Sequence, residues 1–251
     1  MKSRLSEIAR PVMIACIAST LLVGCDITVG GISSNIVQGS GKVITEQRSV
    51  SEVAEVVFAM SGQLFIEQNG SEALTIEADD NIVPLITTDM NGNKLTIATR
   101  PNTGFNTTKQ IVFRLSVKDL NSIRSTGSGN IQMGEWNAAN AKLEAIGSGS
   151  MDMNGITAGS IAVSISGSGA VAASGKATGQ DVTLSGSGRY DGRQLESTTA
   201  KVAISGSGDA TVKVSDSLDA KVSGSGSVRY IGNPTVLTSD TGSGKITQIA
   251  P

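Results

Sequence analysis

Seven copies of the tripeptide Gly-Ser-Gly recur at nearly constant spacing in the second half of the chain, and this period restricts the fold more than any other feature. The copies begin at residues 127, 147, 167, 186, 206, 224 and 242, so successive copies lie 18 to 20 residues apart. This period is too long for a heptad and too short for a paired-helix repeat, but it suits one coil of a β-solenoid. We therefore predict a wound stack of strands with one tripeptide in each coil.

Apolar and polar residues alternate on both sides of the tripeptides. The positions four and two residues before the first glycine are apolar in most copies, as at Val163 and Ile165, and the position between them is mostly polar. The alternation resumes after the tripeptide, as at Met151 and Met153. A period of two is typical of strands that bury one face. Each repeat is predicted to be strand, bend, strand and looser corner, in an all-β, right-handed, single-stranded parallel β-helix.

The glycines are predicted to form the bends, because a sharp turn between two strands needs backbone angles that glycine adopts at little cost. Stacked coils would also align the serines into a ladder, whose hydroxyls can bond to one another or to neighbouring backbone. A phosphate-binding or nucleophilic role does not fit, because no helix follows the glycines and no base is available. The predicted bend residues are Gly127, Gly129, Gly147, Gly149, Gly167, Gly169, Gly186, Gly188, Gly206, Gly208, Gly224, Gly226, Gly242 and Gly244.

Residues 43–118 are less regular, and we interpret them as eroded coils of the same design that cap the solenoid. Met60-Ser61-Gly62 has the flanking pattern of the tripeptides, and an eighth copy at 39–41 would extend the ladder further. Asn91-Gly92 is a turn typical of β-hairpins. A separate small β domain is the alternative. Further strands are predicted at 73–78, 94–99 and 111–117.

The first 25 residues predict export and lipidation. A basic start precedes an apolar run at 12–23, which is shorter than the roughly 20 residues that span a bilayer. The run ends in Leu22-Val23-Gly24-Cys25, which resembles the lipobox of bacterial lipoproteins, where the cysteine is acylated. We predict a signal peptide at 1–24, a lipidated cysteine with a tether at 25–38, and a solenoid domain at 39–251 whose coils become regular from 119. An ordinary signal peptide with an incidental cysteine is the alternative.

The residue after the cysteine bears on location. Asp26 resembles the inner-membrane retention signal of enteric-type bacteria, so it favours the periplasmic face of the inner membrane. That rule does not hold in all bacteria, and an outer-membrane or surface location stays open. We expect the protein to attach to the membrane through the lipid on Cys25. The other cysteine, Cys16, lies in the signal, so the mature chain would have no disulfide.

Composition and repeat register argue against most kinds of catalytic site, metal site and nucleic-acid binding. The chain has no histidine, which removes the commonest general base and metal ligand. Its net charge of −2 argues against nucleic acid. Pectin-degrading β-helices cluster aspartates on one outer face. Here opposite charges are expected to be neighbours instead, Arg124 with Glu144 and Arg189 with Asp209. The column five residues after each first glycine contains Gln132, Asp152, Ala172, Asp191, Thr211 and Arg229, so the acids do not stack.

Two tyrosines and the remaining acids also have structural explanations. Tyr190 and Tyr230 fall at inward positions of the repeat, which favours packing. Asp79, Asp80 and Asp89 are explained as turn residues. We therefore predict no catalytic, cofactor-binding or metal-binding residues and no cofactor.

Several fragments together resemble the bacterial GIN-domain family, also called DUF2807. They are Gly39-Ser40-Gly41, Thr45-Glu46, Arg48-Ser49-Val50, Phe65-Ile66-Glu67-Gln68-Asn69-Gly70, Asp80-Asn81-Ile82, Leu95-Thr96-Ile97 and the tripeptide array. The resemblance covers residues 39–249. It implies a right-handed parallel β-helix and an envelope location, and the family's members are described as adhesin heads. It supplies no catalytic residues.

These observations predict a non-enzymatic cell-envelope lipoprotein. We expect an adhesin or binding scaffold that presents a rigid surface to a glycan, a cell-wall polymer or a protein. A self-associating structural or stress-linked scaffold is the alternative, and a polysaccharide lyase or hydrolase is a third, less favoured interpretation.

Overall fold

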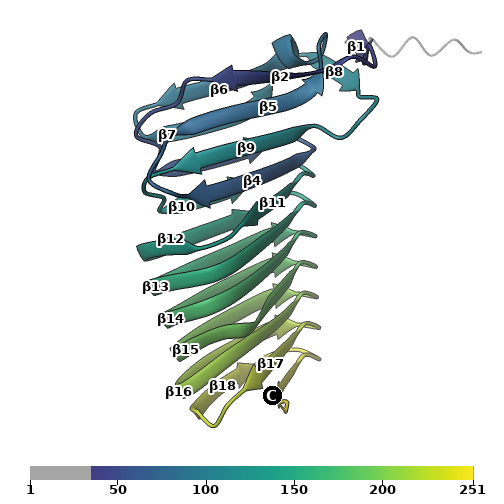
Figure 1. Ribbon diagram of the computed structural model, residues 1–251. Coiled ribbons are helices and arrows are strands. Elements are labelled where there is room, and N and C mark those ends of the chain that lie inside the picture. The colour runs from purple at the N-terminus through teal and green to yellow at the C-terminus, as the bar shows by residue number, and fades with distance from the viewer. Residues whose placement is uncertain (1–34, 251) are drawn as a thin grey trace, which may run out of the picture. The chain divides into compact units, whose positions relative to one another are not determined.

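The computed structural model describes residues 35–250, which form a stack of strands (Figure 1). The predicted signal peptide, Cys25 and Asp26 lie outside the described residues. Within 35–250 the sole helical element is a 3-10 turn, η1 (Val83–Leu85). The strands are β1 (Asn35–Gln38), β2 (Val43–Arg48), β3 (Glu55–Ala59), β4 (Gln63–Gln68), β5 (Ala73–Asp79), β6 (Ile86–Asn91), β7 (Lys94–Thr99), β8 (Thr103–Asn106), β9 (Val112–Val117), β10 (Ser122–Ser125), β11 (Asn130–Met133), β12 (Trp136–Ala145), β13 (Ser150–Gly167), β14 (Ala170–Gly186), β15 (Arg189–Gly206), β16 (Asp209–Gly224), β17 (Ser227–Ile231), β18 (Thr235–Asp240) and β19 (Lys245–Gln248).

Strands β10 to β19 form parallel coils, each lying beside the equivalent part of the coil before it. In the strand before each bend, Ile165 pairs with Leu184, which pairs with Ile204. All three side chains are buried, because alternate residues of every coil point inward to one continuous apolar core. In Figure 1, β12 to β16 are seen one below another along this stack. The predicted all-β solenoid is confirmed.

The two glycines of each tripeptide meet different constraints. The first has a positive φ in four repeats, between 129° and 138° at Gly167, Gly186, Gly206 and Gly224, a range that suits glycine. The second has no positive φ, and in all copies but the last it is buried against the neighbouring coil. A Cβ on Gly208 would lie 2.6 Å from Gly188 O and 3.0 Å from Leu184 Cδ2. Close stacking therefore explains the second glycine.

Backbone hydrogen bonds connect one bend to the next. The Ser207 N–H donates to Gly186 O at 2.9 Å, and the Asp209 N–H donates to Gly188 O at 3.1 Å. The serine side chains of the seven bends are exposed, and in the described part of the chain their hydroxyls donate to no protein group. The serines form a ladder, but its hydrogen bonds run through the backbone.

Differences in coil length are absorbed at the corner opposite the bends. The register shifts between Met153 and Ile156 where β13 meets β14, and between Ala172 and Ser174 where β14 meets β15. Where β15 meets β16 it shifts between Gly192 and Glu196, and again between Ser197 and Thr199. The strands next to the bends keep an unbroken register. A change in the spacing of the tripeptides therefore reflects residues gained or lost at the opposite corner of the coil.

The N-terminal cap contains two irregular coils whose order in the stack differs from their order in the chain. β3 and β4 pair in parallel with β10 and β11, and Met60-Ser61-Gly62 forms the bend between them. β7 and β9, which come later in sequence, pair in parallel with the other edges of β3 and β4. Antiparallel strands then cover the outer coil: β6 pairs with β7 through the predicted hairpin at Asn91-Gly92, β5 pairs with β9, and β2 pairs with β5. This end therefore finishes in antiparallel strands.

The prediction that residues 39–41 extend the bend ladder is wrong. This segment joins β1, which pairs with β8 in a separate two-stranded sheet, to the antiparallel strand β2. Asp79 holds it in place: Oδ1 accepts hydrogen bonds from the Gly41 N–H at 2.9 Å and the Thr108 hydroxyl at 2.7 Å, and Oδ2 accepts one from the Thr108 N–H at 3.0 Å. These bonds, with those from Thr108 foremost, hold the pKa of Asp79 below its ordinary value.

The C-terminal coil has polar residues at two of its inward positions. In β18, Thr238 and Asp240 pair with Ala220 and Val222 of β16, which are buried. Thr238 and Asp240 are themselves exposed. Inward-pointing polar and charged residues at an edge oppose the addition of further strands. The apolar core therefore ends within this coil.

Candidate functional site

The outer column of aspartates does not form a catalytic cluster. Asp152 pairs in register with Ala172, which pairs with Asp191, so one coil separates the two acids, as predicted. Asp191 instead lies 2.8 Å from the Arg193 guanidinium. Within residues 35–250 no three acidic or cysteine side chains gather closely enough to hold a metal ion. This column has no arrangement typical of a lyase or hydrolase.

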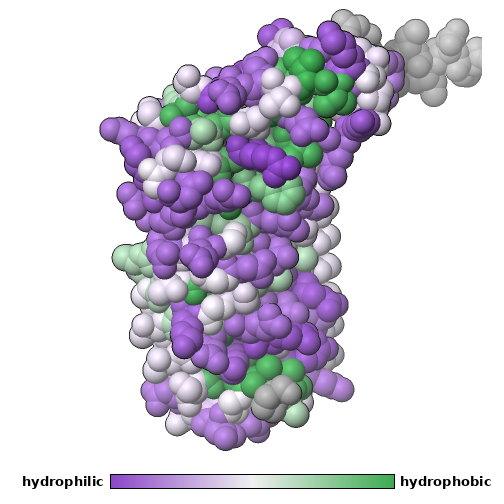
Figure 2. Space-filling model, viewed as in Figure 1, coloured by the Kyte–Doolittle hydropathy of each residue, from purple (hydrophilic) through white to green (hydrophobic). Residues whose placement is uncertain are grey.

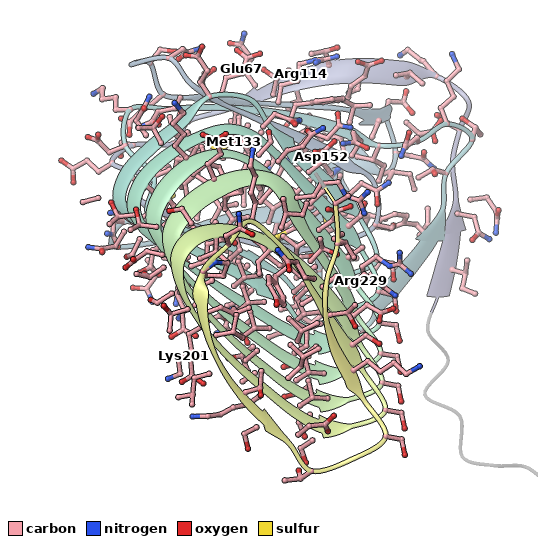
Figure 3. All side chains as sticks on the ribbon, turned by 90° about the horizontal axis from the view of Figure 1, so that it is seen from below. Glu67, Arg114, Met133, Asp152, Lys201 and Arg229 are labelled. Atoms are coloured by element: carbon pink, nitrogen blue, oxygen red, sulfur yellow. The ribbon has the colours of Figure 1, made fainter. Side chains whose placement is uncertain are left out.

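The two predicted charge pairs between neighbouring coils are present. Arg189 lies 3.9 Å from Asp209, and Arg124 pairs with Glu144. The arginines are about half exposed or more, so each pair contributes at most about 1 kcal/mol. Polar residues cover most of the face visible in Figure 2, and Figure 3 places Lys201 and Arg229 on opposite sides of the solenoid. These pairs are ordinary features of an exposed surface.

A groove of about 590 Å³ crosses four neighbouring coils at the corner opposite the bends. Its size falls within the range of about 300 to 1,000 Å³ that is typical of small-molecule sites. Ala177 and Val214 are its apolar side chains. Its polar lining includes Lys176, Glu196, Thr198, Lys213, Ser215 and Asn233.

The groove lies where the coils shorten from 20 residues to 18. β15 pairs with β16 at Gly192 and Val212, and pairing resumes at Glu196 and Lys213, so three residues of β15 have no partner on β16. Further along, β16 has two residues between Val214 and Ser217 where β15 has one, so β16 there contains one extra residue. The shorter coil does not cover the whole of the longer one, which leaves the groove beside it.

A buried polar network forms beside this register break. Gln180, Tyr190 and Ser197 are 3%, 1% and 7% exposed. The Tyr190 hydroxyl donates to Gln180 Oε1 at 2.8 Å, and Gln180 Nε2 donates to Ser197 Oγ at 2.8 Å and to Leu195 O at 3.2 Å. Burial, with the nearby Asp191 charge, strongly raises the pKa of Tyr190, so its hydroxyl keeps the proton that it donates.

The network satisfies carbonyls at the register break. Leu195 lies in the unpaired segment of β15, and its carbonyl accepts from Gln180. Ser197 Oγ donates to Lys213 O at 2.9 Å. Buried carbonyls without partners are costly, so these side chains hold the irregular corner in one conformation. The groove is therefore preformed.

A row of alternating charges borders the groove. Lys176 pairs in register with Glu196, and Glu196 with Lys213, on three successive strands. Lys213 Nζ lies 2.9 Å from Glu196 Oε1. The hydrogen bond from Lys213, with the charges of Lys213 and Lys176, lowers the pKa of Glu196. Within 35–250 Lys176 makes no ion pair, so the row has one surplus positive charge.

Sequence reasoning placed both tyrosines correctly: Tyr190 is buried, and Tyr230 is half-buried and packs against the core. It did not predict the groove. The available signals were the change in tripeptide spacing from 20 to 18 and the polar Gln180 at an inward position. Its register neighbours Ile161 and Ala200 are apolar. The predicted lipid anchor and sorting residue lie outside the described residues, and no helix within 35–250 is long and apolar enough to cross a membrane.

Comparisons with known proteins agree on the fold. A crystal structure of a putative adhesin from Bacteroides fragilis is 28% identical, with a TM-score of 0.82 over 85% of this chain and 100% of that one. A putative lipid binding protein from Parabacteroides distasonis is 23% identical, with a TM-score of 0.71 over 85% and 99% of the two chains. A putative adhesin from Parabacteroides merdae is 22% identical, with a TM-score of 0.68 over 85% and 98%. The last two show a shared fold.

No curated protein matches the chain. A family model does: residues 53–234 match the family described as "Putative auto-transporter adhesin, head GIN domain", DUF2807. The match spans more than half of the sequence and includes six of the seven regular tripeptides. The chain therefore belongs to the GIN-domain family, DUF2807.

Proposed function

We propose that this protein is a non-enzymatic adhesin or binding scaffold of the bacterial cell envelope, whose solenoid presents a rigid surface to a glycan, a cell-wall polymer or a protein. The observation that carries the proposal is the preformed groove on a stack of paired coils. Its floor is held by buried hydrogen bonds, so little ordering is needed when a ligand binds. Membership of a family described as adhesin heads supports the same function.

The proposed attachment to the membrane is a lipid on Cys25, with Asp26 favouring the periplasmic face of the inner membrane. An anchor with two or more acyl chains holds a protein firmly, whereas one chain gives marginal binding. Labelling with radioactive palmitate should mark the wild-type protein and fail on Cys25→Ala. Label on both proteins would contradict the anchor. Membrane fractionation of Asp26→Ser tests sorting, which should move toward the outer membrane.

The binding function is tested by a pull-down from solubilised envelope, with the full chain as bait. We expect capture of a defined polysaccharide or envelope protein, and loss of adhesion or envelope integrity when the gene is deleted. A bait that captures neither, together with a deletion that changes nothing, would refute the proposal.

Self-association through the C-terminal end receives no support from the described residues. Thr238 and Asp240 occupy inward positions of the last coil, where a continuing stack would need apolar side chains.

A further inference from the structure

We propose that the groove between β14, β15 and β16 binds a carboxylated sugar, with Lys176 contacting the carboxylate. This inference rests on the proposed binding function and names the ligand class for its site. Three features carry it: the surplus charge of the groove, the chemistry of its lining, and the rigidity of its floor.

The charge of the groove favours an anion. Lys213 is paired with Glu196 at 2.9 Å, and its hydrogen bond lowers the pKa of Glu196, a carboxyl that is ionised at neutral pH. Lys176 pairs in register with Glu196 from β14, the strand on the side away from Lys213, and its side chain is exposed. The groove thus carries a net positive charge on a chain whose net charge is −2. A lysine ammonium donates charge-assisted hydrogen bonds to a carboxylate.

The lining favours a sugar over a peptide. Thr198, Ser215 and Asn233 offer hydroxyl and amide groups that can both donate to and accept from sugar hydroxyls. Peptides are usually held by a free strand edge or by apolar pockets. Here Glu196 and Ser197 of β15 pair with β14 on one side and with β16 on the other, and the apolar side chains of the groove are only an alanine and a valine.

The floor and one wall of the groove are fixed. Ser197 is held between Gln180 Nε2 and Lys213 O, at 2.8 and 2.9 Å. Gly232, in the wall, has a φ of 112°, and a Cβ there would collide with Val214 O. Gln248 Nε2 donates to Gly232 O at 2.7 Å. Polar groups held in this way present one geometry to a ligand, which favours selective recognition.

The test is calorimetric titration of the full chain with trigalacturonate and with its methyl ester, which has the same sugars but no charge. We expect the acid to bind about ten-fold more tightly than the ester, since one charge-assisted hydrogen bond is worth about that factor. Lys176→Gln should remove this preference. Lys201→Gln is the matched control, because Lys201 is an exposed lysine of the same solenoid that does not line the groove, and it should bind like wild type.

A second variant predicts a gain. Glu196→Gln releases Lys213 and adds one positive charge to the groove, so trigalacturonate should bind about three-fold more tightly or better. Circular dichroism checks that each variant is folded, which is expected because all three side chains are exposed.

The proposal is overturned if the ester binds as tightly as the acid, if Lys201→Gln loses as much affinity as Lys176→Gln, or if Glu196→Gln gains none. Acetate that competes at the concentration of the sugar would reduce the groove to a simple anion site, which also overturns it. Failure here is distinguishable from failure of the binding function. Envelope capture that Lys176→Gln leaves intact would refute the groove assignment alone, whereas no capture would refute both.

Discussion

Replacing Gly208 by alanine should destabilise the solenoid, because the second glycine of each bend lies against the backbone of the neighbouring coil. The added Cβ would lie 2.6 Å from Gly188 O, whereas carbon and oxygen atoms usually stay about 3.3 Å apart or more. The bend would have to move by roughly 0.7 Å to restore that separation. This movement weakens the bond from the Asp209 N–H to Gly188 O, which is already 3.1 Å long.

The expected cost follows from these contacts. A weakened backbone hydrogen bond costs about 1 kcal/mol. Crowding against Leu184 Cδ2, 3.0 Å from the added Cβ, costs about 2 kcal/mol more, a typical value for overpacking. Alanine restricts the unfolded chain and returns about 0.7 kcal/mol. The net loss in the free energy of unfolding is therefore about 2 kcal/mol.

Guanidinium unfolding followed by circular dichroism measures this loss. Gly134→Ala is the matched control, because Gly134 has no atom within 4 Å of the added Cβ and no positive φ. It should be neutral or up to about 1 kcal/mol more stable than wild type. If Gly208→Ala were as stable as Gly134→Ala, the close stacking of the bends would not be the reason for the second glycine.

Three further predictions address the network, the cap and the open end. Tyr190→Phe should lower the free energy of unfolding by about 1 to 2 kcal/mol, because Gln180 Oε1 loses its buried donor; unchanged stability in the same unfolding assay would contradict the network. Asp79 has a lowered pKa, so its contribution to stability is present above the ordinary aspartate value of about 3.9 and is lost as pH falls through its folded pKa. The stability advantage of wild type over Asp79→Asn should therefore shrink below about pH 4, and an advantage independent of pH would argue against this role of the Asp79 carboxylate. Thr238→Val combined with Asp240→Val should make the C-terminal coil apolar and cause concentration-dependent association in light scattering, whereas a strict monomer would contradict the role of the polar end.

The regular stack could be predicted residue by residue because every coil repeats the same two constraints. Alternation decides which side chains point inward, and the tripeptide spacing aligns one coil with the next. The column of Asp152, Ala172 and Asp191 was therefore predictable, as was the Arg189–Asp209 pair. The strands at 94–99 and 73–78 were also recognisable from local pattern, although β5 extends one residue further.

The cap and the groove depend on information that local patterns lack. The antiparallel pairing of β5 with β9 joins segments about 40 residues apart, and neither segment shows which edge it will meet. A change in spacing from 20 to 18 shows that two residues are lost, but not at which corner. The structure places the loss at the segment around Leu195, which has no partner on β16. The Leu195 carbonyl therefore lacks a strand partner, and the Gln180 side chain donates a hydrogen bond to it.

A glycan array probed with the labelled full chain tests the central claim, that this solenoid is a binding module whose ligand occupies the groove. The account predicts selective binding to glycans that carry carboxylates, about ten-fold weaker signals for Lys176→Gln, and unchanged signals for Lys201→Gln. Absence of binding to any glycan, or binding that Lys176→Gln leaves unaltered, would contradict it.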